Sequence, residues 1–253
     1  MWEARHGFPR AERLPSGHRR YSEQDVERVL EVVRARDGGL SLTAAIERLT
    51  SDGAGGQPET SIYAGLRRRR AELHPSPVPK RLLVAVSHAI EDESSAHGAR
   101  ALLIGSFQRE QFYRAAEPRW REFSRSAELA LAMADFEKPA FPPDGPVEVP
   151  IDRDHPLASE WAIVCDAPGF SACLAGRERQ VTGERVFEVL WSVEPEVVRD
   201  AALIGIELAT ARLPELAERV PERLSMPPDP DREAVARATS ITNRILAYVA
   251  AVG

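Results

Sequence analysis

The sequence contains little lysine, little cysteine and no long apolar run. Of its 33 basic residues only Lys80 and Lys138 are lysine. Its two cysteines, Cys165 and Cys173, are too few for the disulfide framework of a small secreted domain and favour a reducing compartment. No apolar stretch is long enough to span a bilayer, and the N-terminus lacks the apolar core of a signal peptide. We therefore expect a cytoplasmic protein that does not enter a membrane.

Charge is distributed unevenly along the 253 residues. Residues 1–80 carry 14 basic against 11 acidic side chains, a net charge of +3, and the remainder carries 19 against 28, a net charge of −9. A hydrophobic content of 43% is that of a globular protein, and the length allows one or two domains. The asymmetry predicts that any polyanion is bound by the N-terminal part.

The first 21 residues, MWEARHGFPRAERLPSGHRRY, hold five arginines and two histidines around two turns. Two short amphipathic helices are expected after them, beginning near Ser22 and Ser41. The first would turn Val26, Val29, Leu30 and Val33 inward. Helices this short must pack on the preceding segment. A basic, turn-rich segment next to short helices is typical of a winged DNA-binding module, although an arginine-rich surface loop is the alternative.

The order of residues favours the DNA-binding interpretation. Trp2-Glu3-x-Arg5-x-Gly7-Phe8-Pro9, followed by Arg13 and Gly17-His18-Arg19-Arg20-Tyr21, resembles the end of the recognition helix and the wing of the mercury-resistance (MerR) family of winged helix-turn-helix regulators. The resemblance implies a homodimer on double-stranded DNA, since palindromic sites need paired modules. It also implies DNA contacts, mainly to phosphates, from Arg5, Arg13, His18, Arg19, Arg20 and Tyr21.

The resemblance covers residues 1–49, about the C-terminal two-thirds of such a domain. The first helix and most of the recognition helix would precede Met1, so we expect a partial, N-terminally truncated winged helix-turn-helix. Either translation starts upstream of Met1, or the chain is a relic that has lost the ability to read DNA.

Residues 50–79 are expected to form a linker and a hinge helix. Thr50–Glu59 is rich in glycine, and Thr60–Leu73 has a helical pattern that contains four consecutive arginines, Arg67–Arg70. These arginines form either a solvated helix face or a second contact to phosphate or to an acidic surface. Three prolines between residues 75 and 79 end the helix, and we place the domain boundary at about 74–80.

Residues 80–253 are expected to form an α/β domain in which helices cover a sheet. A helix is predicted over 80–93. The predicted strands are 101–105, 128–134, 147–151 (an edge strand), 161–165, 170–176 and 185–192. The other predicted helices are 109–116, 117–127, 195–213 and 232–252, with a helical or irregular connection over 214–230.

The Ser-His-Ala-Ile-Glu-Asp-Glu run at 87–93, together with Leu66-Arg67-Arg68-Arg69, resembles the DICT sensory domain, named for diguanylate cyclases and two-component systems. The resemblance implies a domain that senses a signal for an attached output module, with His88, Glu91, Asp92 and Glu93 in its most recognisable motif. Adjacent carboxylates at a helix C-terminus are unfavourable without a partner. We expect an arginine, with Arg100 and Arg114 as candidates.

Ligands of open α/β sheets bind at the C-terminal ends of strands. The candidate ligand-binding residues at such ends are Ser106, Phe107, Asp135, Cys165 and Asp166. No histidine or cysteine has metal-ligand spacing, and no phosphate loop, dinucleotide fingerprint or nucleophile elbow occurs, so the sequence identifies no metal, cofactor or catalytic centre.

Together these features predict a signal-responsive transcription regulator of the MerR type with a DICT-like sensory domain for an unidentified small molecule. Its dimer seam would be Thr60–Leu73 or Arg232–Val252. One alternative is a sensor or protein-interaction module that no longer binds DNA. Another is an enzyme for which turnover would depend on Asp135 or Cys165.

Overall fold

A computed structural model describes residues 12–13, 19–21, 29–30, 32–33, 60–179, 185–228 and 233–252. The chain divides into two compact units, Met1–Gln57 and Pro58–Gly253. Each unit is described by itself below.

In the first unit, two short strands pair. β1 (Glu12–Arg13) and β2 (Arg19–Arg20) are antiparallel, and Arg13 lies opposite Arg19. Residues 29–30 and 32–33 are helical, but Val32 is the buried side chain, whereas Leu30 and Val33 are exposed. The predicted inner stripe is therefore wrong at these two positions, because apolar residues lie so densely here that periodicity cannot select one face.

Several predicted DNA contacts lie outside the described part of the first unit. Arg5 and His18 are among the residues that the structure does not describe, as are the side chains of Arg13, Arg19 and Arg20. Tyr21 is described and is exposed.

The second unit is built on a mixed seven-stranded sheet in the order β3-β9-β8-β7-β4-β5-β6. β4, β5 and β6 are parallel, and β7, β8, β9 and β3 continue from β4 as antiparallel neighbours. The strands are β3 (Ser76–Pro79), β4 (Leu102–Ser106), β5 (Leu129–Ala134), β6 (Val147–Pro150), β7 (Glu160–Ala167), β8 (Phe170–Arg179) and β9 (Val186–Ser192). The predicted α/β class is thus confirmed.

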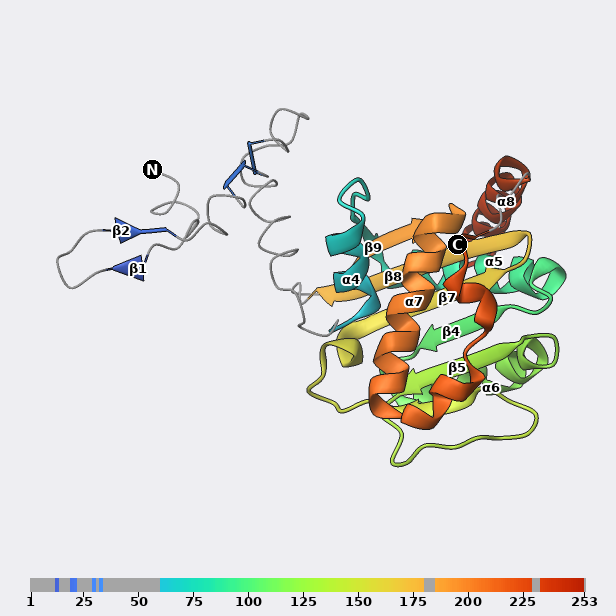
Figure 1. Cartoon of the computed structure of the whole chain (residues 1–253). Helices are drawn as coiled ribbons and strands as arrows, with labels where there is room; N and C mark the ends of the chain where they lie inside the picture. Colours follow the sequence, from blue (N-terminus) through green and yellow to red (C-terminus); the bar gives the residue numbers. More distant parts are fainter. Residues whose placement is uncertain are drawn as a thin grey trace. The chain divides into compact units, whose positions relative to one another are not determined.

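Helices cover both faces of this sheet (Figure 1). α4 (Ile62–Arg69) and α7 (Pro195–Arg212) lie on one face, and α5 (Lys80–His97) and α6 (Glu110–Ser124) lie on the other. α8 (Ala234–Val252) packs against α5, and the short 3₁₀ helices η1 (Pro156–Ser159), η2 (Pro214–Arg219) and η3 (Glu222–Ser225) complete the unit. Each face of the sheet has its own apolar core.

The central strands form because their residues are apolar on both sides. Every residue of β4 and β5 is buried, as expected for parallel strands that lie between two layers of helices. None of the described helices is long and apolar enough to cross a membrane.

Two elements differ from the prediction because of proline. Residues 76–79, SPVP, form edge strand β3, although their prolines indicated only a break; an edge strand tolerates the missing N–H groups. α6 is one helix and not two, and it contains Pro118, which is exposed.

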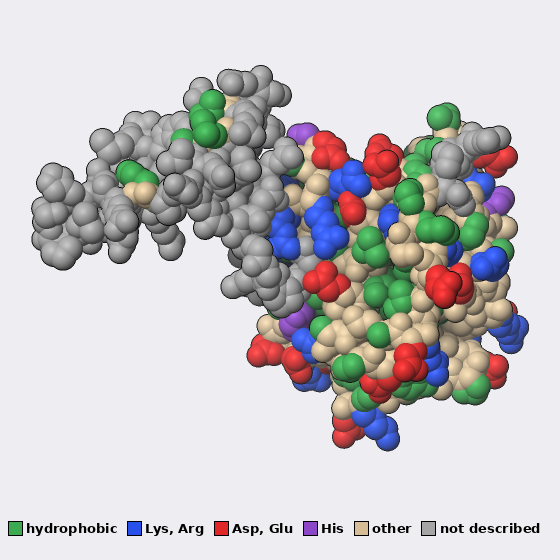
Figure 2. All heavy atoms as spheres, in the orientation of Figure 1, with side chains coloured by type: hydrophobic (Ala, Val, Ile, Leu, Met, Phe, Trp, Pro, Cys, Tyr) green, Lys and Arg blue, Asp and Glu red, His purple; other side chains and the backbone are tan. Residues whose placement is uncertain are grey.

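Residues 60–79, assigned above to a linker and hinge, lie within the second unit. The apolar side of α4 is buried in the core beneath α7, and β3 belongs to the sheet. The arginine run at the end of α4 faces acidic residues of α7: Arg70 binds Asp200 at 2.5 Å, and Arg69 lies 3.5 Å from Glu207. Basic and acidic side chains are correspondingly mixed beside α4 (Figure 2).

Candidate functional site: a cavity between α5 and α6

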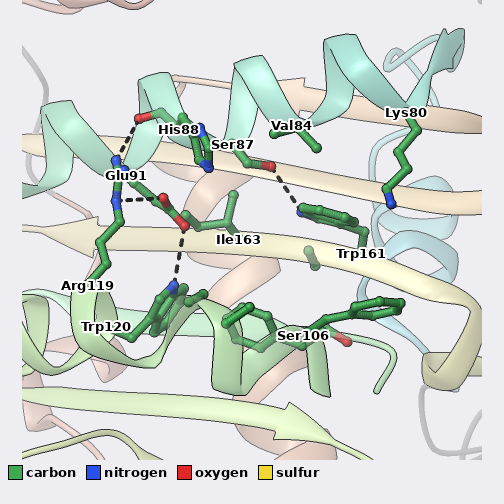
Figure 3. A pocket seen from close by; sticks show the side chains of 15 residues that line it. Lys80, Val84, Ser87, His88, Glu91, Ser106, Arg119, Trp120, Trp161 and Ile163 are labelled. Carbon is green, nitrogen blue, oxygen red and sulfur yellow. Dashed lines mark hydrogen bonds and ion pairs between the residues drawn. The ribbon is translucent and has the colours of Figure 1, made fainter. Parts of the chain in front are cut away.

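A cavity of about 440 Å³ lies over β4 and β7, between α5 and α6 (Figure 3). Its walls are the facing sides of the two helices, because the lining positions recur at helical spacing. α5 contributes Lys80, Val84, Ser87, His88 and Glu91, and α6 contributes Phe112, Ala115, Ala116, Arg119 and Trp120. Ser106, Phe107, Trp161, Ala162 and Ile163 complete the lining from the sheet side.

Small residues keep this cavity open. Ala115 and Ala116 lie between Phe112 and Trp120 on α6, where larger side chains would fill the space. Under the cavity, the rings of Phe107 and Trp120 meet edge to face at 5.2 Å. A Cβ atom at Gly105 would lie 2.6 Å from both rings, so glycine is needed for this aromatic wall.

The loop after β4 has an unusual backbone. Gln108 is buried and has a φ of 60°, in the left-handed region that non-glycine residues rarely adopt. Its side chain is fixed on both sides, since Nε2 donates to Glu178 at 3.2 Å and Oε1 accepts from Arg185 at 3.0 Å. Strain of this kind is common beside binding sites, and Gln108 directly follows Phe107, which lines the cavity.

One end of the cavity holds an ion pair between a buried carboxylate and a partly exposed arginine. The carboxylate of Glu91 lies 2.8 Å from Nε of Arg119 and accepts a hydrogen bond from Nε1 of Trp120 at 3.3 Å. Burial raises the pKa of Glu91 to about 6, against the opposing effects of Arg119 and Trp120. Burial, and then the positive charge of Arg119, lowers the pKa of His88 and so favours the neutral imidazole.

The other end holds Lys80, which is exposed at the mouth. Its Nζ lies 5.8 Å from the centre of the Phe112 ring, and among the described residues no carboxylate pairs with it. Its charge contributes to a lowered pKa of nearby Glu178, a shift caused mainly by the hydrogen bond from Arg185. Glu178 is thus already neutralised by Arg185, and Lys80 keeps an unbalanced positive charge.

The remaining motif carboxylates point to α8 and do not line the cavity. Asp92 accepts a hydrogen bond from the Tyr248 hydroxyl, and Glu93 accepts from Nε of Arg244 at 2.6 Å and from the Ser240 hydroxyl. Although burial opposes it, these hydrogen bonds lower the pKa of Glu93. His88 contacts the Tyr248 ring at 5.5 Å. The motif therefore joins the cavity wall to α8.

The expected arginine partner exists, but the candidates named for it were wrong. Arg119 and Arg244 bind the motif carboxylates, whereas Arg100 lies near Glu128 and Arg114 binds Glu148. The correct partners are 27 and 151 residues away from the carboxylates that they bind, a separation that local patterns cannot bridge.

The five candidate ligand-binding residues do not converge. Ser106 and Phe107 border the cavity. Asp135 instead serves the start of α6: its Oδ1 accepts from the backbone N–H of Glu110 at 2.6 Å, and its Oδ2 accepts from Arg153.

Cys165 and Asp166 lie at the opposite edge of the sheet. β7 is antiparallel to β4, so Asp166 pairs with Leu102 at the start of β4, whereas the strand-end argument assumed parallel strands. Asp166 is buried and binds Arg199 at 2.6 Å and Arg223 at 2.6 Å. Cys165 and Cys173 are free thiols, and burial raises the pKa of each to about 12.

Four residues of the cavity were not predicted from the sequence as site residues: Lys80, Arg119, Trp120 and Trp161. The spacing of Lys80, Val84, Ser87, His88 and Glu91 along one side of a predicted helix was the signal that could have identified the wall. Within the described ranges, no group of three or more His, Cys, Asp or Glu side chains is placed to hold a metal ion.

The cavity has the volume and the largely apolar lining of a small-molecule site. Two family models match the chain: a sensory domain of diguanylate cyclases and two-component systems (DICT) over residues 60–179, and the MerR helix-turn-helix family of regulatory proteins over residues 1–52. The chain therefore carries a MerR-type helix-turn-helix region followed by a DICT sensory domain, and the DICT match includes every residue that lines the cavity. No curated protein and no solved structure is significantly similar to the chain.

Proposed function

We propose that the chain is a cytoplasmic, signal-responsive transcription regulator. Its first unit binds double-stranded DNA, and its second unit senses a small molecule in the cavity between α5 and α6. The observation that carries this proposal is the presence of a MerR-type region and a DICT domain in one chain, with a cavity inside the DICT match. The two free, buried thiols fit a reducing cytoplasm.

Pairing of β1 with β2 supports a DNA-binding role for the first unit. The antiparallel register places Arg13 opposite Arg19, and such a strand pairing is what the proposed wing requires. Residues 1–57 carry nine basic and nine acidic side chains, but residues 1–21 carry five against two, and this local net charge of +3 favours contact with phosphates.

Sensing, and not catalysis, fits the chemistry of the second unit. A catalytic thiol must form a thiolate, but the raised pKa values of Cys165 and Cys173 oppose this. Asp135 is occupied as the cap of α6, and Asp166 is held by two arginines. We therefore assign no enzymatic activity to these residues.

A homodimer is part of the proposal, and α8 is the better of the two predicted seams. α4 is buried within its own unit. The charged side chains of α8, Arg237 and Arg244, bind Glu233 and Glu93. The exposed residues of α8 carry no charge and are Val235, Ala236, Thr239, Thr242, Asn243, Leu246, Ala247, Val249, Ala250 and Ala251. An uncharged face of this length suits a two-fold interface between identical helices.

The test is DNA binding by the full chain. A fluorescently labelled duplex from the region upstream of its own gene would be titrated at several salt concentrations, and anisotropy would give the affinity. We expect affinity to fall steeply with salt, and the substitutions R19Q and R20Q together to reduce the slope of log K against log salt by about 2. The matched pair R121Q and R125Q, in the last turn of α6 and directly after it, should leave that slope unchanged. Absence of salt-dependent binding would favour a sensor module that does not bind DNA.

A further inference from the structure

The polar groups of the cavity restrict the chemistry of its ligand. Glu91 is already bonded to Arg119 and Trp120, and Arg119 also binds Asp92 at 2.6 Å. Burial, and then the charge of Arg119, lowers the pKa of His88 and favours its neutral form. Lys80 therefore supplies the one unbalanced charge among the side chains that line the cavity, and this charge is positive.

The rest of the lining selects a flat apolar body. Phe107, Phe112, Trp120 and Trp161 surround the space, and Val84, Ala115 and Ala116 add aliphatic surface. The indole N–H groups of both tryptophans are already bonded, that of Trp161 to the Ser87 hydroxyl at 3.0 Å. These rings consequently offer faces and edges to a ligand but no further donors.

The charge and the apolar part are separated along the cavity. Lys80 and Glu91 lie on one side of α5 eleven residues apart, which corresponds to about 16 Å of helix, and Figure 3 shows them at opposite ends with Trp161 between them. A ligand that lies between the helices would meet Lys80 with one end and the aromatic rings with the other.

We propose that this cavity binds a small organic acid, a flat apolar body of one or two rings with a single carboxylate that pairs with Lys80. The carboxylate lies at the mouth, where it stays partly solvated, and the rings lie between Phe112, Trp161 and Trp120. This assignment rests on the sensory role proposed above and names the chemical class of the signal.

Three probes of the same shape test the assignment: 2-naphthoate, its neutral amide 2-naphthamide, and the cation 2-naphthylmethylammonium. Each would be titrated into the full chain by calorimetry at low salt. We expect the acid to bind tightest and the cation weakest. An exposed ion pair contributes up to about 1 kcal/mol, so K80M should weaken acid binding by about fivefold and leave amide binding unchanged.

The chain offers a matched control because Lys138 is its other lysine and is exposed. K138M should leave the affinity for all three probes unchanged. Equal affinities for acid and amide, equal effects of K80M and K138M, or no binding of any probe would overturn the proposal.

Location is tested separately by filling the cavity. A116L should weaken naphthoate binding by more than tenfold while the far-ultraviolet spectrum stays native, and A64L, at an exposed position on α4, should have no effect. If A116L fails to fold, reductive methylation with ¹³C-formaldehyde gives a second readout. It labels two lysine side chains, and naphthoate should shift the signal of Lys80 and not that of Lys138. The assignment is contradicted if naphthoate binds without shifting either lysine signal. It is also contradicted if folded A116L binds naphthoate as tightly as the wild type.

These measurements need no DNA. A chain that binds naphthoate but no duplex would contradict the regulatory function and keep the ligand class. A chain that binds DNA but none of the probes would contradict the ligand class alone.

Discussion

Glu160 is a carboxylate that is buried at the start of a helix. It projects from β7, and its two oxygens accept hydrogen bonds from the backbone N–H groups of Ile62 at 3.1 Å and Tyr63 at 2.8 Å. It therefore satisfies, from the sheet, two of the free N–H groups at the start of α4. Burial raises its pKa to about 7, despite the opposing hydrogen bonds from Ser61, Tyr63 and Ile62.

Because of this raised pKa, we expect the free energy of unfolding to decrease as pH rises. The folded state binds the proton of Glu160 more tightly than the unfolded state, so its contribution is complete below pH 4.5 and is lost as pH rises to about 7. Relative to E160Q, we expect the wild-type free energy of unfolding to drop by on the order of 3 kcal/mol between pH 4.5 and 8. Urea denaturation at several pH values measures the difference.

The E160Q side chain has one fewer acceptor oxygen, which changes the free energy of unfolding by about 1–3 kcal/mol. This change is the same at every pH. E122Q, at an exposed position of α6, controls for the loss of a carboxylate. If the free energies of unfolding of wild type and E160Q change in parallel with pH, Glu160 does not titrate between pH 4.5 and 8.

At the level of single residues, the sequence reveals which groups need partners but not which partners they have. The three adjacent carboxylates 91–93 correctly predicted arginine, because adjacent charges must be compensated. Glu160 gave no such signal, since it lies at the start of an apolar run and the N–H groups that it binds are 97 and 98 residues away.

Among the elements, α5 has the central position on its face of the sheet. One side of it lines the cavity, and its last turns bind α8 through Asp92 and Glu93. The Glu93 carboxylate is buried, whereas Arg244 is half-exposed. The polar contacts between the two helices are therefore concentrated at a few side chains.

Removal of Arg244 should loosen α8 without unfolding the sheet. R244Q leaves buried Glu93 with only Ser240 and the more distant His97, so we expect a loss of about 1–2 kcal/mol. Hydrogen exchange should accelerate about tenfold in the amides of α8 and remain unchanged in β4 and β5. R125Q removes an exposed pair with Glu122 and should change stability by less than about 0.5 kcal/mol. Equal exchange in both variants would show that apolar packing alone holds α8.

Elements were predictable where burial on both faces made the sequence uniformly apolar. ALLIG, ELALAMA and WAIVC all became central strands β4, β5 and β7. β3 was not predictable from SPVP, because its pairing with β9 depends on its place at the edge of the sheet. The antiparallel direction of β7 was equally invisible, and this is why Cys165 and Asp166 were grouped with residues at the wrong edge.

At the scale of the molecule, the cavity, α5 and α8 form one connected path within the second unit. His88 and Glu91 line the cavity, His88 touches Tyr248, and Tyr248 and Arg244 hold the helix with the uncharged exposed face. A ligand that displaces His88 or Arg119 would therefore act directly on the contacts that position α8. If α8 is the dimer seam, the path connects the signal to the pairing of two DNA-binding units.

Charge placed on that face should separate the two copies. Leu246 is 62% and Val249 45% exposed, so L246E and V249E together introduce repulsion across a two-fold seam with little effect on the fold. Light scattering should give twice 27.9 kDa for the wild type and 27.9 kDa for the variant. M226E, at a 60% exposed apolar side chain outside α8, should remain dimeric.

The same variant should bind DNA more weakly, because one unit on a half-site lacks the effective concentration that its linked partner provides. A loss of about a hundredfold is expected from bivalency. If the L246E/V249E variant remains a dimer, the dimer interface lies elsewhere. If the wild type is monomeric at every concentration, sensing does not act through dimerisation.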